Sequence, residues 1–210
     1  MARSSSRYHH GDLRRALFDA LGEAVLEAGP ASVSLRELAR RAGVSHAAPA
    51  HHFGGKRGLL TAFAAEGHRL LAQALHDAAA RSGGDFTDVG LAYVSFALGH
   101  RAHFDVMFRP ELLQRGDPEL VAAMQASSLE LRAGASQEPA TTATADPEAE
   151  MIAAWSLVHG FATLWLSGNI PGDLGPADEL ARRVSRALDG SSDATGARPP
   201  APRPRREPGG

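Results

Sequence analysis

The sequence has no cysteine, few aromatic residues and no hydrophobic run long enough to span a membrane as a helix. Without cysteine there can be no disulfide framework, thiolate zinc site or cysteine nucleophile. The longest nearly uncharged apolar run, 151–166, is shorter than the roughly 20 residues that a membrane-spanning helix needs. The first residues also lack the apolar stretch of a secretory signal. We therefore expect a cytoplasmic protein with no membrane partner.

Patterns typical of β-strands are missing as well. The chain has no alternating Val, Ile, Thr and Tyr run and no Asn-Gly hairpin turn. Apolar residues instead recur at helical spacing along most of the chain. The sequence therefore predicts an all-α fold, with two short helices capped by Ser34 and Ser45 and longer helices at 12–28, 56–80, 86–100, 102–108, 117–133, 147–167 and 177–188.

The net charge of −2 hides an uneven distribution. Residues 1–57 hold nine Lys and Arg against five Asp and Glu, whereas residues 58–190 hold nine against seventeen. A basic head on an acidic body is typical of a nucleic-acid-binding segment attached to a regulatory or oligomerising domain. Composition also predicts a mobile loop at 134–147 and a disordered tail at 190–210, where no large apolar residue occurs.

Two short helices joined by a glycine-containing turn are predicted at 35–53. Ser34 and Glu37 have the spacing of a capping box, which marks the start of the first of them. Ala39 is small enough for a closely crossing helix, Gly43 suits a tight turn, and Ser45 is a good N-cap for the second helix. This is the pattern of a helix-turn-helix unit, whose second helix enters the DNA major groove.

The residues that follow make the pattern more specific. A long helix is predicted to follow His52 and Phe53. Lys56 comes after a two-residue gap, and the pair Leu59 and Leu60 comes next. This arrangement resembles the tetracycline-repressor (TetR) family of bacterial transcription regulators. The resemblance implies a three-helix DNA-binding head at 11–58 behind a basic arm at 1–10, and a larger helical-bundle body for ligand binding and dimerisation at 59–189.

Further segments resemble one subgroup of that family. They are the opening YHHGDLRRAL, the run HFDVMFRPEL at 103–112, and a helix carrying Trp155, His159 and Gly160. The sequence departs from the family at Ala50, where a tyrosine is usual. Pro49 lies inside the predicted recognition helix, where its missing N–H removes one backbone hydrogen bond.

The resemblance implies a repressor that binds a pseudo-palindromic operator as a homodimer and leaves it when a small-molecule inducer binds. Dimerisation would use the last two helices. The residues expected to contact operator DNA are Ser34, Arg36, Ser45, His46, Ala47, Ala48, His51, His52 and Lys56.

The body offers a second set of candidates. Concave apolar sites form between bundle helices, and the expected ligand-pocket residues are Phe96, His100, His103, Phe104, Met107, Phe108, Trp155, His159 and Phe161. Three of these are histidines, so a metal or haem site is an alternative. Because no carboxylate or fourth ligand stands at a recognisable spacing, we expect no metal and no cofactor.

An enzymatic alternative rests on one dipeptide. His76 and Asp77 form the His-Asp doublet used by metal-dependent phosphohydrolases of the HD type. The doublet falls on a helix that amphipathic packing already explains, and no nucleophile elbow, phosphate loop or H-E-x-x-H motif appears. We therefore expect a regulator and not an enzyme.

Overall fold

The computed structural model describes residues 5–83, 85–135 and 146–188, and within these ranges every regular element is helical. The all-α prediction is confirmed. The predicted tail at 190–210 and most of the predicted loop at 134–147 lie outside the described residues. The elements are α1 (Ser5–Ala28), η1 (Pro30–Ser32), α2 (Leu35–Arg41), α3 (Ala48–Phe53), α4 (Lys56–Ser82), α5 (Phe86–Gly99), α6 (Arg101–Met107), η2 (Pro110–Leu112), α7 (Pro118–Ala135), α8 (Pro147–Leu166), η3 (Gly172–Leu174) and α9 (Ala177–Leu188).

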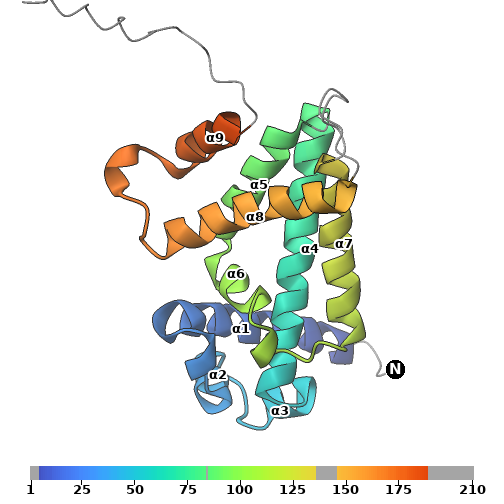
Figure 1. Ribbon diagram of the computed structural model, residues 1–210. Coiled ribbons are helices and arrows are strands. Elements are labelled where there is room, and N and C mark those ends of the chain that lie inside the picture. The colour runs from blue at the N-terminus through green and yellow to red at the C-terminus, as the bar shows by residue number, and fades with distance from the viewer. Residues whose placement is uncertain (1–4, 84, 136–145, 189–210) are drawn as a thin grey trace, which may run out of the picture.

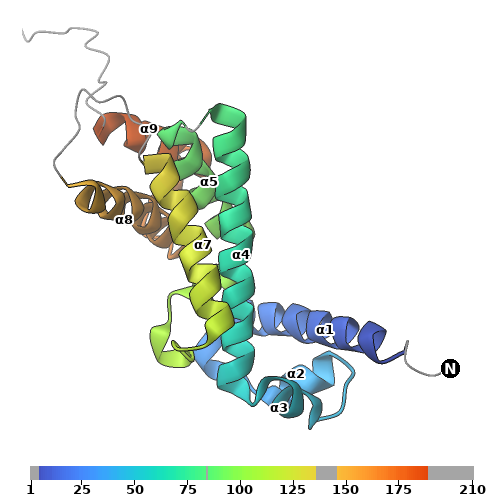
Figure 2. The ribbon, with the colours of Figure 1, turned by 90° about the vertical axis from the view of Figure 1, so that its right-hand side faces the viewer.

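The helices form a small head and a taller body, as Figure 1 shows. Helices α1, α2 and α3 gather at one end, and α4 starts among them and runs through the body. Seen from the side in Figure 2, α7 lies along α4 for most of its length. Helix α8 crosses the body against α5 and α7, and α9 packs on α5 and α8. Among the described helices, α4 runs through both the head and the body, and α1 of the head also packs on α6 of the body.

Burial follows the apolar stripes of the sequence. On α4, Leu59, Phe63 and Leu75 are almost completely buried, and Leu17 and Leu21 of α1 are fully buried in the same core. Each such side chain contributes about 1.5–3 kcal/mol on burial. The stripe on α4 therefore fixes the head to the body through one continuous core. None of the described helices is long and apolar enough to cross a membrane.

The first helix begins earlier than predicted. It starts at Ser5 rather than near residue 12, so Asp12 lies inside the helix and does not cap it. Residues 5–11 contain no proline, and one glycine in a helix costs only about 1 kcal/mol relative to alanine. Part of the predicted basic arm, from residue 5 to 10, is therefore helical.

Candidate nucleic-acid interface and body cavities

Helices α2 and α3 are joined by the tight turn that the sequence predicts. Gly43 adopts a left-handed conformation with φ of 65°, and the Val44 backbone N–H donates to the carbonyl oxygen of Ala39 at 3.0 Å. Ala39 and Leu38 are fully buried where the helices meet. Only a small side chain fits at such a crossing, and only glycine adopts this φ without strain. The helix-turn-helix geometry is thus present.

The predicted capping box is wrong in its hydrogen bonds, although Ser34 is the N-cap of α2. The Ser34 side chain makes no capping hydrogen bond in the described structure, and only its carbonyl oxygen accepts from Leu38 N–H, at 3.0 Å. The Glu37 carboxylate turns to two arginines instead. Because bonds from a charged donor are stronger than a bond from a neutral backbone N–H, the Glu37 carboxylate bonds to the arginines and not to the Ser34 backbone N–H. The Ser34 side chain is exposed.

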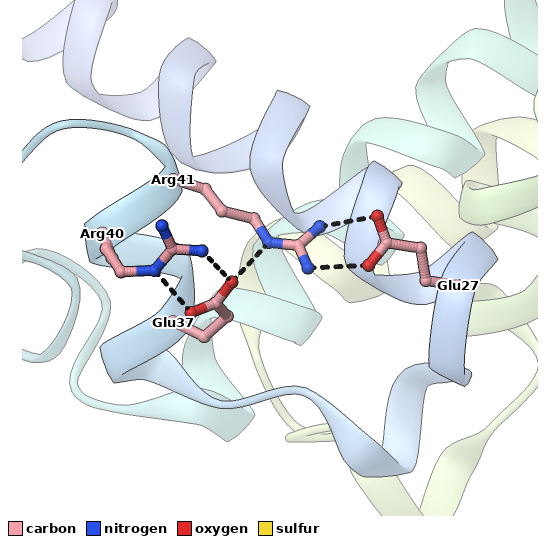
Figure 3. Close-up of polar contacts among 4 residues, drawn as sticks. All are labelled: Glu27, Glu37, Arg40 and Arg41. Atoms are coloured by element: carbon pink, nitrogen blue, oxygen red, sulfur yellow. Dashed lines mark hydrogen bonds and ion pairs between the residues drawn. The ribbon is translucent and has the colours of Figure 1, made fainter.

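Four charged side chains tie α2 to α1, as Figure 3 shows. Arg41 makes two hydrogen bonds to Glu27, at 2.9 and 2.6 Å, and a third to Glu37 at 2.9 Å. Arg40 makes two more to Glu37, at 2.8 and 2.6 Å. These bonds from Arg40 and Arg41 lower the pKa of Glu37 to about 2. The network is largely exposed, so its contribution to stability is small.

The predicted start of the third helix is also wrong. Helix α3 begins at Ala48, three residues after Ser45, and the carbonyl oxygen of Ser45 accepts from Ala48 N–H at 3.0 Å. Pro49 explains the shift, because proline is tolerated in the first turn of a helix, where its missing N–H has no partner to lose. Pro49 is buried there. His46 and Ala47 consequently lie on the turn before the helix.

The residues expected to contact DNA lie on this unit and its flanks. Those exposed to solvent are Ser34, Arg36, Ser45, His46, Ala47 and His51, and those half-buried are Ala48, His52 and Lys56. The His52 ring packs edge-on against Phe53, with centroids 4.7 Å apart. Ala50, at the position where the family usually has tyrosine, is exposed.

Lys56 has a structural contact that the sequence did not predict. Its Nζ donates to the carbonyl oxygen of Ala31 at 2.6 Å. Lys56 is the first residue of α4, and Ala31 lies in η1 between α1 and α2. The ammonium group has three donors, so this bond leaves two for another acceptor. Lys56 therefore links the start of α4 to η1 and keeps its positive charge at the edge of the head.

The end of α3 packs very closely against the first turn of α4. A Cβ atom on Gly58 would lie 1.8 Å from the carbonyl oxygen of Phe53. Above this corner, Arg57 donates to the carbonyl oxygen of Glu111 at 2.8 Å, and Thr61 Oγ1 accepts from Gln114 N–H at 2.9 Å. The segment between α6 and α7 is therefore hydrogen-bonded to the first turns of α4, directly after the recognition helix.

The structure places the nine ligand-pocket candidates in several separate parts of the body. Phe96 and His100, with centroids 5.0 Å apart, line a cavity of about 580 Å³ between α4 and α5. Phe161 borders a void of only about 10 Å³ and stacks near Trp165. Helical spacing indicates which residues face inward but not which cavity they meet, so their role in ligand binding stays a prediction.

Trp155, Phe104, Phe108 and His159 do come together, around a residue that the sequence analysis missed. Tyr93 of α5 is buried; it accepts from Trp155 Nε1–H at 3.2 Å and lies 2.9 Å from His159 Nδ1. The Tyr93 hydroxyl therefore forms hydrogen bonds to both Trp155 and His159 of α8. Burial raises the pKa of Tyr93 and lowers that of His159. Tyr93 stood in an apolar stripe, where only its hydroxyl hinted at a polar partner.

The remaining histidines do not assemble a metal site within the described residues. The His103 ring stacks on Phe63 at 3.9 Å and lies 3.4 Å from Glu66, and burial lowers its pKa. No group of three or more His, Cys, Asp or Glu side chains gathers in the described ranges. His76 and Asp77 engage neighbours on the surface: His76 lies 3.4 Å from Glu130, and Asp77 accepts from a glutamine of its own helix.

A third cavity of about 650 Å³ lies between the end of α6 and α7. Of the predicted residues, Met107 and Phe108 line it. The sequence analysis missed the α7 residues on its other wall: Leu120, Val121, Met124, Gln125, Ser128, Leu129 and Arg132. Their helical spacing was visible, but nothing in it distinguishes a wall of an open groove from a buried face.

Two family models match the two parts of this architecture. Residues 17–63 match bacterial regulatory proteins of the tetR family, and residues 86–188 match the tetracyclin repressor-like C-terminal domain. The chain belongs to the TetR family. The first match covers the helix-turn-helix unit and the start of α4, and the second covers α5 to α9.

Solved structures agree with this assignment. A Rhodococcus sp. RHA1 protein of unknown function is 33% identical, with a TM-score of 0.72, over 88% of this chain and 97% of its own. The TetR regulator PfmR from Thermus thermophilus (20% identity, TM-score 0.65, 83% and 98%) has the same fold. NalD, the secondary repressor of the MexAB-OprM multidrug efflux pump in Pseudomonas aeruginosa, also has this fold. It is 21% identical with a TM-score of 0.58, and the match covers 87% of this chain and 96% of NalD. No curated protein matches the chain.

As a TetR protein, the chain is a DNA-binding transcription regulator with a repressor-like, ligand-binding C-terminal domain. The HD-phosphohydrolase alternative has no support from the matched families or from the similar structures.

Proposed function

We propose that this TetR protein represses transcription by binding a pseudo-palindromic operator as a homodimer and that a small-molecule inducer releases it. The observation that supports this proposal is that α4 runs through both parts: its first turn packs on the recognition helix and its remainder forms the spine of the body. A change in the body that tilts α4 must therefore move the recognition helix.

The DNA-binding face is formed by the turn before α3 and the exposed side of α3. His46 and Ala47 precede the helix, where a recognition element approaches base edges, and His51 lies one turn into it. Ser34 and Arg36 at the start of α2, together with Lys56, would contact phosphates. The exposed hydroxyl of Ser34 supports this role, because no capping bond occupies it in the described structure.

The homodimer would form through α8 and α9. Helix α8 exposes Ile152, Trp155 and Leu164, at 48%, 37% and 50%. Large apolar side chains that a helix exposes often mark a surface that a partner covers. A self-complementary face gives two-fold symmetry, and two-fold symmetry places two recognition helices on a palindromic site.

The route from body to head runs through α6 and the segment after it. A Cβ on Gly67 of α4 would lie 2.6 Å from Met107 Sδ, so α4 and α6 touch closely. Below this contact, Arg57 and Thr61 of α4 hold the backbone at Glu111 and Gln114. A ligand that displaces α6 or this segment would change the tilt of α4.

We also infer membership in the subgroup with a Trp-His-Gly helix. Trp155, His159 and Gly160 occupy α8, and the first two join the hydrogen-bonded cluster around Tyr93. Since its partner is operator DNA, we infer a cytoplasmic protein.

The test begins with selection of bound sites from random duplex DNA, followed by titration of the selected site and of the DNA upstream of the chain's own gene. His46→Ala is expected to weaken binding and relax sequence preference, because His46 lies where base edges are read. His76→Ala is the matched control, since His76 is an exposed histidine on α4 in the body. Failure to select any palindromic site would overturn the proposal, and metal-dependent phosphatase activity lost with His76→Ala would favour the enzyme alternative.

A further inference from the structure

The groove between α6 and α7 has the size of a ligand site and is open to solvent along α7. Its volume of about 650 Å³ falls within the roughly 300–1,000 Å³ typical of small-molecule pockets. Met107, Phe108 and Leu113 form one wall, and Leu120, Val121 and Met124 belong to the other. Most of this lining is aliphatic or thioether, which favours an apolar ligand without a fixed aromatic shape.

The groove is elongated. Its α7 wall extends from Leu120 to Arg132, which at the helical rise corresponds to about 18 Å. Val121, Met124 and Leu129 on this wall are 36%, 45% and 65% exposed. The apolar residues of this wall, from Leu120 to Leu129, span about 14 Å. An apolar strip of this length matches an extended aliphatic chain better than a compact ring system.

Charge on the lining is of one sign. Arg115 and Arg132 line the groove, and none of its lining residues is acidic. This is unusual for the body, since residues 58–190 hold nine Lys and Arg against seventeen Asp and Glu. Arg115 precedes α7 and Arg132 lies near its C-terminal end, so a cation stands toward either end of the apolar strip. Guanidinium groups bind carboxylates in a two-point geometry.

We infer that this groove binds a linear aliphatic carboxylate, with its chain along α7 and its head group on Arg115 or Arg132. The inference rests on the proposed function, because it names the chemical class of the inducer. It also explains how such a ligand would act on DNA binding.

The groove shares a wall with the segment that is tied to the head. Pro110, Leu113 and Arg115 line it, and within the same segment the backbone at Glu111 and Gln114 is hydrogen-bonded to Arg57 and Thr61 of α4. A chain inserted beside Leu113 pushes on this segment directly. The force reaches α4 within its first two turns, next to the recognition helix.

The experiment measures binding of decanoate to the purified full chain by calorimetry and by the fluorescence of its tryptophans. Trp155 is a local reporter, because its ring centroid lies 6.3 Å from that of Phe108 in the groove wall. We expect saturable binding of one decanoate per chain. Affinity should rise about fourfold for each added methylene from octanoate to decanoate, the effect of burying one CH₂. Decanol and decyltrimethylammonium should bind at least tenfold more weakly.

Variants at exposed positions locate the site without disturbing the core. Met124→Glu should reduce decanoate affinity at least tenfold, by placing a like charge in the strip. The double variant Arg115→Gln/Arg132→Gln should do the same, and the two single variants show which end holds the carboxylate. Arg81→Gln is the matched control, because Arg81 lines the separate cavity between α4 and α5.

Equal binding of decanoate, decanol and decyltrimethylammonium, or unchanged affinity in Met124→Glu, would overturn the inference. The inference would also be overturned if a second copy of the chain occupied the groove. In that case decanoate would not bind, and Met124→Glu would dissociate the dimer. Operator binding of the ligand-free protein is measured separately. Its loss would refute the proposed function, whereas intact operator binding that decanoate does not weaken would refute only this inference.

Discussion

Gly58 and the carbonyl oxygen of Phe53 stand so close that a Cβ atom at Gly58 would lie 1.8 Å from that oxygen. The atom that would have to move belongs to the backbone at the end of α3. The recognition helix can therefore pack directly against α4 because Gly58 has no side chain.

Gly58→Ala should separate α3 from α4. The clash is with backbone, so we expect destabilisation of about 3 kcal/mol, the upper end of the usual cost of overpacking, and loss of operator binding. Thermal unfolding and DNA titration measure the two effects. Gly99→Ala is the control, because a Cβ at Gly99 would meet no described atom within 4 Å. Equal stability and equal operator affinity of the two variants would show that α3 and α4 can move apart without loss of stability or binding.

Substitution of Glu37 should change how stability depends on pH. Its pKa is lowered to about 2 by Arg40 and Arg41, so its stabilising contribution is complete above about pH 4.5 and disappears as the pH falls toward 2. Wild type should melt above Glu37→Gln at pH 6, and the difference should vanish near pH 2. Glu119→Gln, which removes one exposed contact to Arg69 at 2.9 Å, should show a smaller difference. A constant gap across the range would contradict the assigned ion network.

The helix-turn-helix unit could be predicted from the sequence because each of its requirements is local. Gly43 needs only its own φ, and Ala39 needs only to be small where two helices cross. The start of α3 was misplaced because Ser45 is a good cap by itself, whereas Pro49 decides which turn is the first. The partners of Glu37 were missed because Arg41 is fixed by Glu27, on a different helix.

The cavities could not be predicted because they depend on which helices are neighbours. Met107 and Phe108 were named as pocket residues, and they do line a groove, yet its second wall is the exposed face of α7. In the sequence, Val121 and Met124 are simply part of an amphipathic helix. Periodicity shows that a face is apolar, and only the fold shows that α6 stands opposite it.

His68 should make the protein sensitive to mild acid. It is 5% exposed, its Nδ1 lies 2.9 Å from Ser127 Oγ, and Ser127 Oγ donates to the Met124 carbonyl oxygen. Nδ1 therefore carries the proton, and Nε2 is buried without a partner among the described residues. Burial lowers the pKa of His68 to about 4.

Because the folded protein resists protonation of His68, stability is present above the unfolded pKa of 6.5 and lost as the pH falls toward 4. The loss amounts to roughly 3 kcal/mol for a shift of this size. Denaturant unfolding at pH 7 and pH 4.5 measures it. His68→Leu should flatten this part of the profile, while Ser127→Ala, which keeps the histidine, should not. An unchanged slope in His68→Leu would assign the acid sensitivity elsewhere.

Charge on the exposed face of α8 should dissociate the dimer. Leu164 is 50% exposed, so Leu164→Glu leaves the monomer core intact while burying a charge in the proposed interface. We expect a monomer by light scattering and an operator affinity at least tenfold weaker. Leu70→Glu, at a position on α4 that is 37% exposed, is the control. A charge at the neighbouring Trp165 would disturb the fold itself, because Trp165 packs against the core. A Leu164→Glu dimer as tight as wild type would place the interface elsewhere.

Substitution of Lys56 tests whether its side chain both stabilises the fold and contacts DNA. Its bond to Ala31 uses one of three donors and leaves the positive charge in place. If the ammonium also contacts a phosphate, Lys56→Met should weaken binding to all duplexes alike and reduce the slope of log affinity against log salt by about 0.9. Lys56→Arg should restore the slope, because it restores the charge. If Lys56 serves only the fold, Lys56→Met lowers the melting temperature and the affinity while the salt slope stays at the wild-type value. The slope, and not the affinity, therefore separates a phosphate contact from a purely structural bond.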